Sequence, residues 1–163
     1  KKLSYSFLGP AWAEELLKFL ILYLIVVKRN EFNEPMDGIV YGVTVSLGFA
    51  TYENYDYVFR LAELWEIDPY QMAVWRSYSA VPMHGLNGAI MGFFFGMYSF
   101  TANKKYLILC LLIPFLIHGF YNFLGYPYHY LIVIFALIYS LVLHSKLKKL
   151  QSSKNKEQEV KKI

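Results

Sequence analysis

YLILCLLIPFLIHGFYNFLGYPYHYLIVIFALIYSLVL, residues 106–143, contains no Lys, Arg, Asp or Glu. A helix that crosses the hydrocarbon core of a bilayer needs about 20 apolar residues, so this stretch is long enough for two crossings. The sequence Gly125-Tyr126-Pro127 interrupts it near the middle, as expected for a turn between two helices. The stretch therefore predicts a pair of antiparallel transmembrane helices.

The rest of the chain continues this pattern. Of its 163 residues, 56% are hydrophobic and 19% are aromatic, and the charges gather in short segments between uncharged runs. Soluble domains rarely keep such long runs free of charge, so we predict an all-α, polytopic membrane helical bundle. The five expected spans are residues 8–27, 36–59, 79–100, 106–124 and 128–143, within a transmembrane domain of residues 1–145.

Two segments fall outside these spans. Residues 60–78 are polar but carry several Trp and Tyr residues, which favour the headgroup zone, and Asp68-Pro69 has the form of a helix N-cap followed by a first-turn proline. We therefore expect a helix within 60–78 that lies on the membrane surface. The tail, residues 146–163, contains seven lysines and two glutamates, and we expect a short helical extension that frays and is drawn to anionic lipid.

The distribution of positive charge predicts the orientation. Lys28-Arg29, Lys104-Lys105 and the lysine-rich tail fall on one side of an antiparallel bundle, and Lys1-Lys2, Arg60 and Arg76 fall on the other. The positive-inside rule assigns the first side, with the C-terminal tail, to the cytoplasm. The chain enters a helix pattern soon after Lys1, and we expect at least one further span before it.

Polar and ionisable residues interrupt four of the predicted spans. An acidic or basic residue at the middle of a span costs about 2.5–3.5 kcal/mol on insertion scales, so such residues need a partner or a function. At 1.5 Å per residue, counting from the cytoplasmic charges places all four groups roughly 20–25 Å from the inner surface, in the outer half of the bilayer. This common depth predicts one shared site built from Glu14, Glu15, Lys18, Glu53, Asn54, His84, His118 and Asn122.

Spacing predicts which helix faces meet. Glu14 with Lys18, and His118 with Asn122, lie one turn apart and can pair. Small residues recur every four positions in the second and third spans, which lets helix backbones approach closely. We interpret these stripes as packing surfaces; they comprise Gly38, Gly42, Ser46 and Ala50 in one span and Gly88, Gly92 and Gly96 in the other.

Four short motifs resemble, in chain order, those of the PrsW family of membrane proteases. They are Glu14-Glu15-x-x-Lys18, Phe49-x-x-x-Glu53-Asn54, His84 followed by Gly88 and Gly92, and His118-x-x-x-Asn122. The family belongs to a wider group with the CAAX prenyl endopeptidases and bacteriocin-processing membrane proteins, and a gamma-secretase subunit is a distant relative. The CAAX branch has a histidine where this chain has Glu53, and this departure leaves the role of Glu53 open.

The resemblance implies an intramembrane endopeptidase that cleaves a single-pass membrane protein, similar to an anti-sigma factor, near its extracytoplasmic side. It implies that Glu14 activates the attacking water and that His118 and Asn122 donate hydrogen bonds to the oxyanion. Both residue types can serve as such donors. Glu15 and Lys18 are expected to orient the helix and the base, and Glu53, His84 and Asn54 to complete the site. No nucleic-acid partner is expected.

A metal-dependent mechanism remains an alternative. Glutamate and histidine are suitable zinc ligands, and Glu14, Glu53, His84 and His118 form the candidate set. The chain has no HExxH motif, and the ligands would come from separate helices, so hydrolysis without a metal is favoured at this stage.

Other interpretations of the same residues stay open. The glutamates and Lys18 can form a structural ion cluster, Glu53-Asn54 can cap a helix end, and the histidines can bridge helices through hydrogen bonds. His129 and His144 fall at span ends and are interpreted as interfacial residues without a role. A proton-coupled transporter also places carboxylates and histidines inside the bilayer, and a non-catalytic membrane scaffold can keep such a cluster for assembly.

Overall fold

The structure is a computed structural model that describes residues 1–160, with side chains described as far as residue 152. Every regular element in this part of the chain is helical. The elements are α1 (Lys2–Ser6), the π-turn η1 (Phe7–Ala11), α2 (Trp12–Leu24), the 3-10 turn η2 (Val26–Lys28), α3 (Pro35–Asp56), the π-turn η3 (Tyr57–Leu61), α4 (Ala62–Leu64), α5 (Pro69–Tyr78), α6 (Ala80–Thr101), α7 (Lys104–Leu124) and α8 (His129–Val160).

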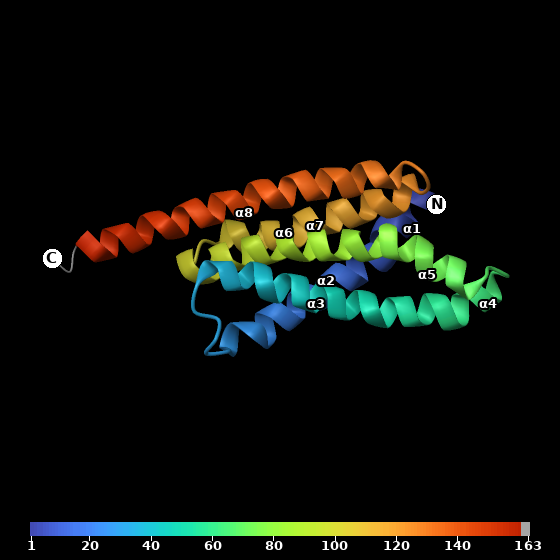
Figure 1. Cartoon of the computed structure of the whole chain (residues 1–163), viewed down its shortest axis with the longest axis horizontal. Helices are drawn as coiled ribbons and strands as arrows, with labels where there is room; N and C mark the ends of the chain where they lie inside the picture. The colour runs from blue at the N-terminus through green and yellow to red at the C-terminus, as the bar shows by residue number, and fades with distance from the viewer. Residues whose placement is uncertain (161–163) are drawn as a thin grey trace.

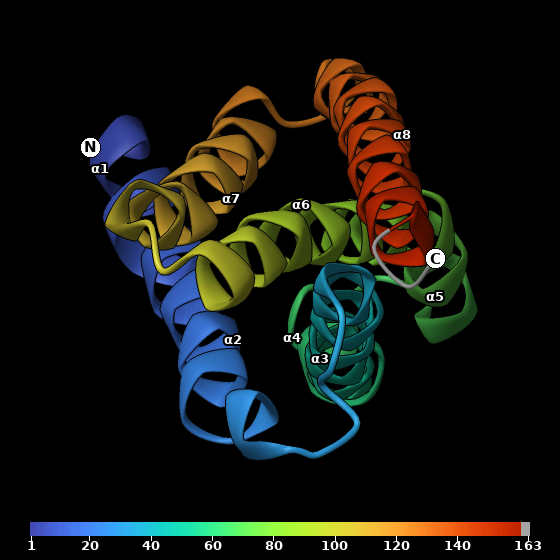
Figure 2. The ribbon, with the colours of Figure 1, turned by 90° about the vertical axis from the view of Figure 1, so that its left-hand side faces the viewer.

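The long helices form a bundle with α6 at its centre. Seen end-on, α3, α7 and α8 surround α6, and α2 lies beside α7 and α3 (Figure 2). The helices run along the long axis of the molecule, with α2 tilted across it (Figure 1). The predicted all-α bundle is therefore confirmed, and α6 is the helix through which most of the others are held together.

Local sequence sets several helix starts. Glu34 and Asp37 form a reciprocal capping box at the start of α3, with Pro35 in the first turn. The Asp68 side chain accepts a hydrogen bond of 2.8 Å from the Gln71 backbone N–H at the start of α5, as predicted from Asp68-Pro69. Such caps satisfy backbone donors that have no partner inside the helix.

The first predicted span, 8–27, is not one continuous helix. The chain kinks at Gly9 (φ −89°, ψ −116°), and the regular helix α2 begins only at Trp12. Pro10 explains the kink, because its ring disfavours a helical conformation at the preceding residue and it has no N–H to donate. The kink lies just before Glu14 and Glu15, so these residues occupy the first turn of α2.

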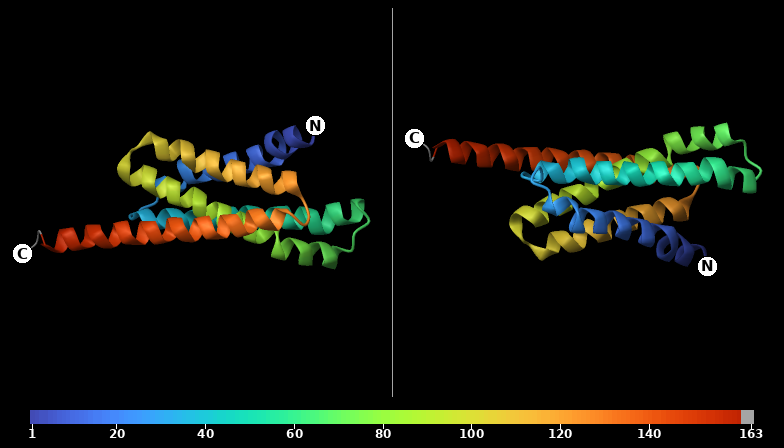
Figure 3. Two further views of the ribbon diagram at one scale, coloured as in Figure 1. Left: turned by 90° about the horizontal axis from the view of Figure 1, so that it is seen from above. Right: turned by 90° about the horizontal axis from the view of Figure 1, so that it is seen from below.

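Residues 60–78 also differ from the expectation of one surface helix. The π-turn η3 and the short α4 continue the direction of α3, a turn with Glu66 at φ 55° follows, and α5 then returns toward α6. In Figures 1 and 3 the hairpin formed by α4 and α5 extends beyond the end of the bundle, and α5 leads from it directly into α6. Its placement on a membrane surface stays a prediction.

The last helix is longer than the predicted span 128–143. No proline or glycine follows Pro127, and α8 continues through Val160, across most of the predicted tail. Residues 161–163 of that tail lie outside the described residues. The spans predicted at 36–59, 79–100 and 106–124 agree with α3, α6 and α7 to within three residues at each end.

α3 and α6 approach each other closely along their glycine stripes. A methyl group on Gly42 would collide with the Gly88 carbonyl oxygen, and one on Gly92 would collide with the Gly38 carbonyl oxygen. Only residues without a Cβ allow this backbone-to-backbone contact. The predicted packing role of the small residues is confirmed, and the contact fixes α6 against α3.

Apolar side chains cover the outside of the bundle. On α8 a helical stripe of exposed residues faces away from the other helices; it comprises Leu131, Ile134, Phe135, Ile138, Leu141 and Val142. An apolar surface of this kind is expected to contact lipid. Within the described residues, α7 (Lys104–Leu124) and the part of α8 covering His129–Ser152 have both the length and the hydropathy of a membrane span. α6 carries His84, Asn87 and four glycines that face other helices, which lowers its hydropathy.

The connections separate into two ends. The α2–α3 connection, the α6–α7 connection and the C-terminal end of α8 lie at one end of the molecule (Figures 1 and 3). The N-terminus, the α4–α5 hairpin and the α7–α8 connection lie at the other. The predicted orientation in the membrane depends on this division of the connections between the two ends.

Candidate active site

Five helices bring polar side chains together inside the bundle. We call this set the polar cluster: Glu14, Glu15 and Lys18 from α2, Glu53 from α3, Arg76 from α5, His84 from α6 and His118 from α7. The predicted convergence of Glu14, Glu15, Lys18, Glu53, His84 and His118 is therefore seen in the structure. Their catalytic roles stay a proposal.

A buried ion pair forms the base of the cluster. Lys18 Nζ lies 2.7 Å from Glu15 Oε1, and the two side chains are 1% and 0% exposed. The predicted pairing of Lys18 with Glu14 is therefore wrong. Glu14 and Glu15 are adjacent in a helix and point about 100° apart, and it is Glu15 that faces the interior with Lys18.

The same Glu15 oxygen fixes the orientation of His118. His118 Nδ1 lies 2.8 Å from Glu15 Oε1. A carboxylate only accepts hydrogen bonds, so Nδ1 carries the proton and donates it. In a neutral imidazole the other nitrogen, Nε2, then has its lone pair free. This lone pair is directed toward Glu14, whose Oε2 lies 3.8 Å away.

Lys18 fixes the tautomer of His84 in the same way. Lys18 Nζ lies 2.9 Å from His84 Nδ1. An ammonium group only donates, so Nδ1 accepts and Nε2 carries the proton. His84 Nε2 then donates to Glu53 Oε2 at 2.9 Å. The rings of His84 and His118 meet edge to face, with centroids 5.3 Å apart.

Arg76 closes the cluster at the side of α5. Its Nη2 lies 2.6 Å from Glu53 Oε2, its Nε lies 2.5 Å from Asn54 Oδ1, and its guanidinium carbon lies 3.8 Å from the centre of the Tyr57 ring. Sequence reasoning used Arg76 only as a charge on the outer side. The sequence placed Arg76 near the predicted depth of Glu53, and this was the only hint that the two residues could meet. The return of α5 toward α3, which brings them together, could not be predicted.

Two amides differ in their surroundings. Asn87 on α6 is fully buried and donates to the Pro114 carbonyl oxygen of α7 at 2.9 Å, so it joins two helices. Asn122 lies one turn beyond His118 on α7, and within the described part of the chain no hydrogen bond to its side chain is seen. The predicted pairing of His118 with Asn122 is therefore not formed among the described residues.

Glu14, like Glu15, has an unsatisfied carboxylate oxygen. Its Oε2 is buried and has no hydrogen-bond partner among the described residues. Ligand atoms of Glu14, His84 and His118 lie within 4.8 Å of one another, a spacing suitable for holding a metal ion. The cluster thus combines positioned imidazoles, carboxylates of different exposure and a buried cation.

Comparison with known proteins identifies the family. The family model described as PrsW family intramembrane metalloprotease matches residues 1–145, which contain the whole polar cluster. The chain belongs to the PrsW family. The resemblance predicted from the four motifs is confirmed, and a membrane location follows from the family together with the apolar surfaces of α7 and α8.

Curated relatives agree with this assignment. Protease PrsW of Bacillus subtilis is 43% identical over 122 residues, which are 73% of this chain and 53% of that protein. Protease PrsW of Geobacillus kaustophilus is 40% identical over 121 residues, 73% of this chain and 51% of that protein. Protease PrsW of Clostridioides difficile is 33% identical over 142 residues, 85% of this chain and 58% of that protein.

The chain thus spans 51–58% of the length of these PrsW relatives. No solved structure matches the chain.

Proposed function

We propose that this chain supplies the active site of an intramembrane protease in which Glu14, His84 and His118 hold a divalent metal ion. The observation that carries the proposal is the pair of unshared acceptors at its centre. Glu14 Oε2 and His118 Nε2 lie 3.8 Å apart, too far for a hydrogen bond, and Glu14 Oε2 has no other partner among the described residues. A cation between them would satisfy both.

The residues present fit zinc in type and spacing. Zinc is bound by histidine nitrogen and carboxylate oxygen at about 2.0–2.2 Å, and catalytic sites commonly use three protein ligands. A metal-binding histidine usually donates its second N–H to a carboxylate, which is the relation between His118 Nδ1 and Glu15. His84 has partners at both nitrogens, so it would join such a site by exchanging one of them.

Glu53 is placed to assist that exchange. Its Oε2 accepts from His84 Nε2 and from Arg76, so His84 would bind the ion through Nδ1 once Lys18 releases that nitrogen, while Glu53 holds the ring or moves to become a further ligand. The same four residues, Glu14, Glu53, His84 and His118, formed the metal set considered from the sequence. The description of the family as metalloproteases also favours a metal. We therefore prefer it to the metal-free hydrolysis favoured from the sequence.

The chemistry divides between the ion and the protein. When bound, the ion would act as a Lewis acid that polarises a peptide carbonyl and lowers the pKa of water. Glu14 and Glu53 are 12% and 17% exposed and are the carboxylates of the cluster that a substrate can approach. Glu53, which lies outside the three proposed ligands, takes the proton from water and returns it to the leaving amine. Glu15 and Lys18, which are fully buried, position the histidines.

Asn122 is a candidate for stabilising the oxyanion. Its side-chain amide is half-buried, lies one turn from His118 and has no partner within the described residues, so its N–H groups are available to a substrate. An amide that donates to a developing oxyanion contributes without changing charge. Asn54 instead accepts from Arg76 and supports Glu53 indirectly.

The substrate we propose is a single-pass membrane protein, of the anti-sigma-factor type that the resemblance implies. The cluster lies toward the end of the bundle that holds the α4–α5 hairpin and the α7–α8 connection. The positive-inside rule makes this the extracytoplasmic end and places the C-terminal end of α8 in the cytoplasm. Cleavage would then occur near the extracytoplasmic end of the membrane-spanning segment of the substrate.

A cleavage assay tests this proposal. Candidate single-pass proteins are reconstituted with the wild-type chain, with Glu14→Gln, and with Glu63→Gln as an exposed matched control. We expect cleavage by wild type and Glu63→Gln and a loss of at least about a hundredfold in Glu14→Gln. Cleavage by Glu14→Gln at the wild-type rate would overturn the role of Glu14.

Chelation separates the two mechanisms. Under the metal proposal, removal of divalent ions abolishes cleavage and zinc restores it. Unchanged cleavage after metal removal, verified by elemental analysis, would favour a glutamate that activates water without a metal. If wild type cleaves nothing but zinc still binds, a non-proteolytic role of the site would be indicated.

A further inference from the structure

A pocket lies about one helical turn along the chain from Arg76 of the polar cluster, toward the same end of the bundle as the α4–α5 hairpin. It has a volume of roughly 490 Å³ and is lined by Trp75, Ser79, Tyr126, His129 and Tyr130. These residues come from α5, from the junction between α5 and α6, and from the α7–α8 connection with the start of α8. Sequence reasoning gave His129 no role.

The pocket is connected to the cluster on two sides. Ser79 follows Arg76 by one turn, and its backbone N–H donates to the Arg76 carbonyl oxygen at 3.3 Å. Tyr121 follows His118 by three residues on α7, and its ring centre lies 5.1 Å from that of His129. One turn of helix rises about 5 Å, so the pocket begins within about two extended residues of the cluster.

One polar atom of a residue that lines the pocket lacks a partner. His129 is 9% exposed, and its Nε2 is buried without a hydrogen bond among the described residues. A buried polar group of this kind carries an energetic penalty until a ligand satisfies it. A peptide group offers both an N–H and a carbonyl oxygen, so it can pair with Nε2 in either tautomer of the ring.

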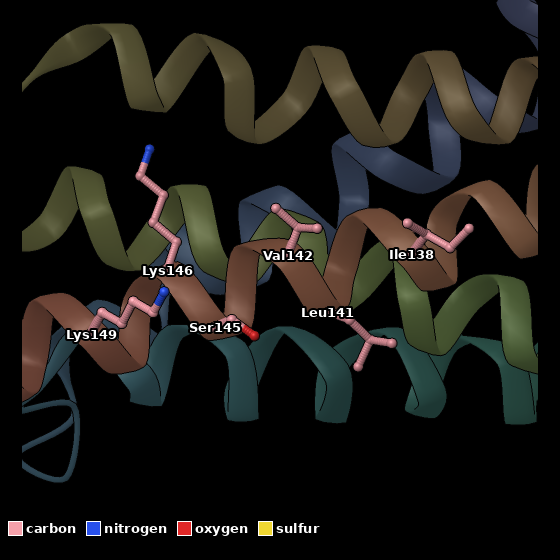
Figure 4. Close-up of a pocket in the computed structure, with 6 residues that line it drawn as sticks. All are labelled: Ile138, Leu141, Val142, Ser145, Lys146 and Lys149. Carbon is pink, nitrogen blue, oxygen red and sulfur yellow. The ribbon is translucent and has the colours of Figure 1, made fainter.

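The rest of the wall suits a large apolar side chain. Trp75, Tyr126 and Tyr130 contribute aromatic faces, which favour edge-to-face contacts with another ring. A hollow of different character lies on α8, where Ile138, Leu141, Val142, Ser145, Lys146 and Lys149 line one open surface (Figure 4). That surface is formed by a single helix and includes no member of the polar cluster, as expected for contact with lipid.

We propose that the pocket at His129 is a substrate subsite that receives a bulky apolar or aromatic residue about two positions from the scissile bond, with His129 Nε2 bonded to the substrate backbone. The assignment rests on the proposed proteolytic function. It accounts for the orphan nitrogen, the aromatic lining and the position beside Arg76 and His118. It also gives the α4–α5 hairpin a role, because α5 supplies one wall of the subsite.

The test measures peptide binding without turnover. The probe is a synthetic single-pass peptide with an alanine-leucine membrane segment and a short outer segment carrying one p-benzoylphenylalanine, placed at each position in turn. The full chain with Glu14→Gln is reconstituted with the probe, irradiated and digested, and the adducts are mapped by mass spectrometry. We expect adducts at Trp75 and within residues 126–130 for one or two adjacent probe positions. Competition by a peptide with Trp at that position should be stronger than by one with Ala.

Two variants and a matched control sharpen the result. His129→Phe keeps an aromatic ring but removes the hydrogen bond, and labelling should fall by about two- to tenfold. Tyr126→Ala opens one wall in an exposed turn and should lower the preference for Trp over Ala. Tyr128→Ala, at another exposed tyrosine of the same turn that does not line the pocket, should change neither. Retained thermal stability of each variant shows that folding is intact.

The outcomes distinguish this inference from the proposed function. Adducts confined to phospholipid, or spread over the apolar surface of α8, would overturn the subsite. If the chain cleaves a single-pass protein but the adducts lie only on phospholipid or on α8, the protease proposal is supported and the subsite is wrong. Specific labelling of the pocket by a chain that cleaves nothing would retain peptide binding and overturn the proteolysis.

Discussion

Glu15 Oε1 lies 2.8 Å from His118 Nδ1, although 103 residues separate the two side chains in the sequence. This contact joins α2 to α7 across the interior of the bundle and sets the direction of the His118 Nε2 lone pair. The same oxygen also accepts from Lys18, so one atom of Glu15 orients both an imidazole and an ammonium group.

Glu15→Gln is therefore expected to weaken zinc binding by about 10–100-fold, the usual effect of losing a carboxylate behind a metal-binding histidine. The amide oxygen can still accept from His118, but Lys18 loses its buried counter-ion, so thermal unfolding is used to check that the variant is folded. Isothermal titration with zinc measures the change, with Glu63→Gln as the exposed control. An unchanged affinity would show that His118 needs no carboxylate to orient it.

The ion pair between Glu15 and Lys18 makes a second prediction. Lys18→Met leaves the Glu15 carboxylate buried without its cation and should lower the free energy of unfolding by about 3–5 kcal/mol. The double variant Glu15→Gln/Lys18→Met removes both charges and should lose less than the two single variants together.

Thermal unfolding in detergent measures this coupling, and Lys28→Met, at an exposed position, is the control. Strictly additive losses would show that the two charges do not stabilise each other.

The contact between α3 and α6 predicts a steric effect. Gly92→Ala places a methyl group against the Gly38 carbonyl oxygen and should destabilise the bundle by about 1–3 kcal/mol, because the colliding atoms are backbone and cannot rotate away. Gly48→Ala on α3 meets nothing within 4 Å and should leave stability unchanged or slightly raised. Equal melting temperatures of the two variants would contradict the close approach.

The contacts of Arg76 predict that replacing it lowers the rate of cleavage, and that lysine does not restore the rate. Its guanidinium spans Glu53 and Asn54 with two separate nitrogens, a geometry that a lysine ammonium cannot reproduce. We expect Arg76→Lys to lower kcat about tenfold and Arg76→Gln to lower it further, on the scale of a lost charge-assisted hydrogen bond. Arg60→Gln removes an exposed ion pair with Asp56 and should have no measurable effect. Full activity of Arg76→Lys would show that Arg76 contributes only its positive charge.

Much of the architecture could be predicted because it depends on local patterns. The uncharged runs around α6, α7 and α8 mark buried or lipid-facing helices, Asp68-Pro69 marks a helix start, and glycines at four-residue spacing mark a close helix contact. The ionisable residues Glu14, Glu53, His84 and His118 could be grouped because each is costly in an apolar helix and counting residues along the spans predicts one depth for all of them.

Contacts within the group could not be predicted, because they depend on helix rotation and on chain direction at turns. Spacing allowed Lys18 to pair with either glutamate, and only the rotation of α2 selects Glu15. The kink at Gly9 and the return of α5 decide where Glu14 and Arg76 lie, and neither follows from hydropathy.

The amino-acid sequence by itself thus determined a membrane bundle, the grouping of its polar residues and the family to which it belongs, since hydropathy and motif spacing are properties of the chain. Tertiary structure alone decided which atoms face each other: the proton on His118 Nδ1, the unpaired Glu14 oxygen and the pocket at His129. The physical reason is that hydrogen-bond direction and cavity shape arise where separate helices meet, and one helix does not encode the rotation of its neighbour.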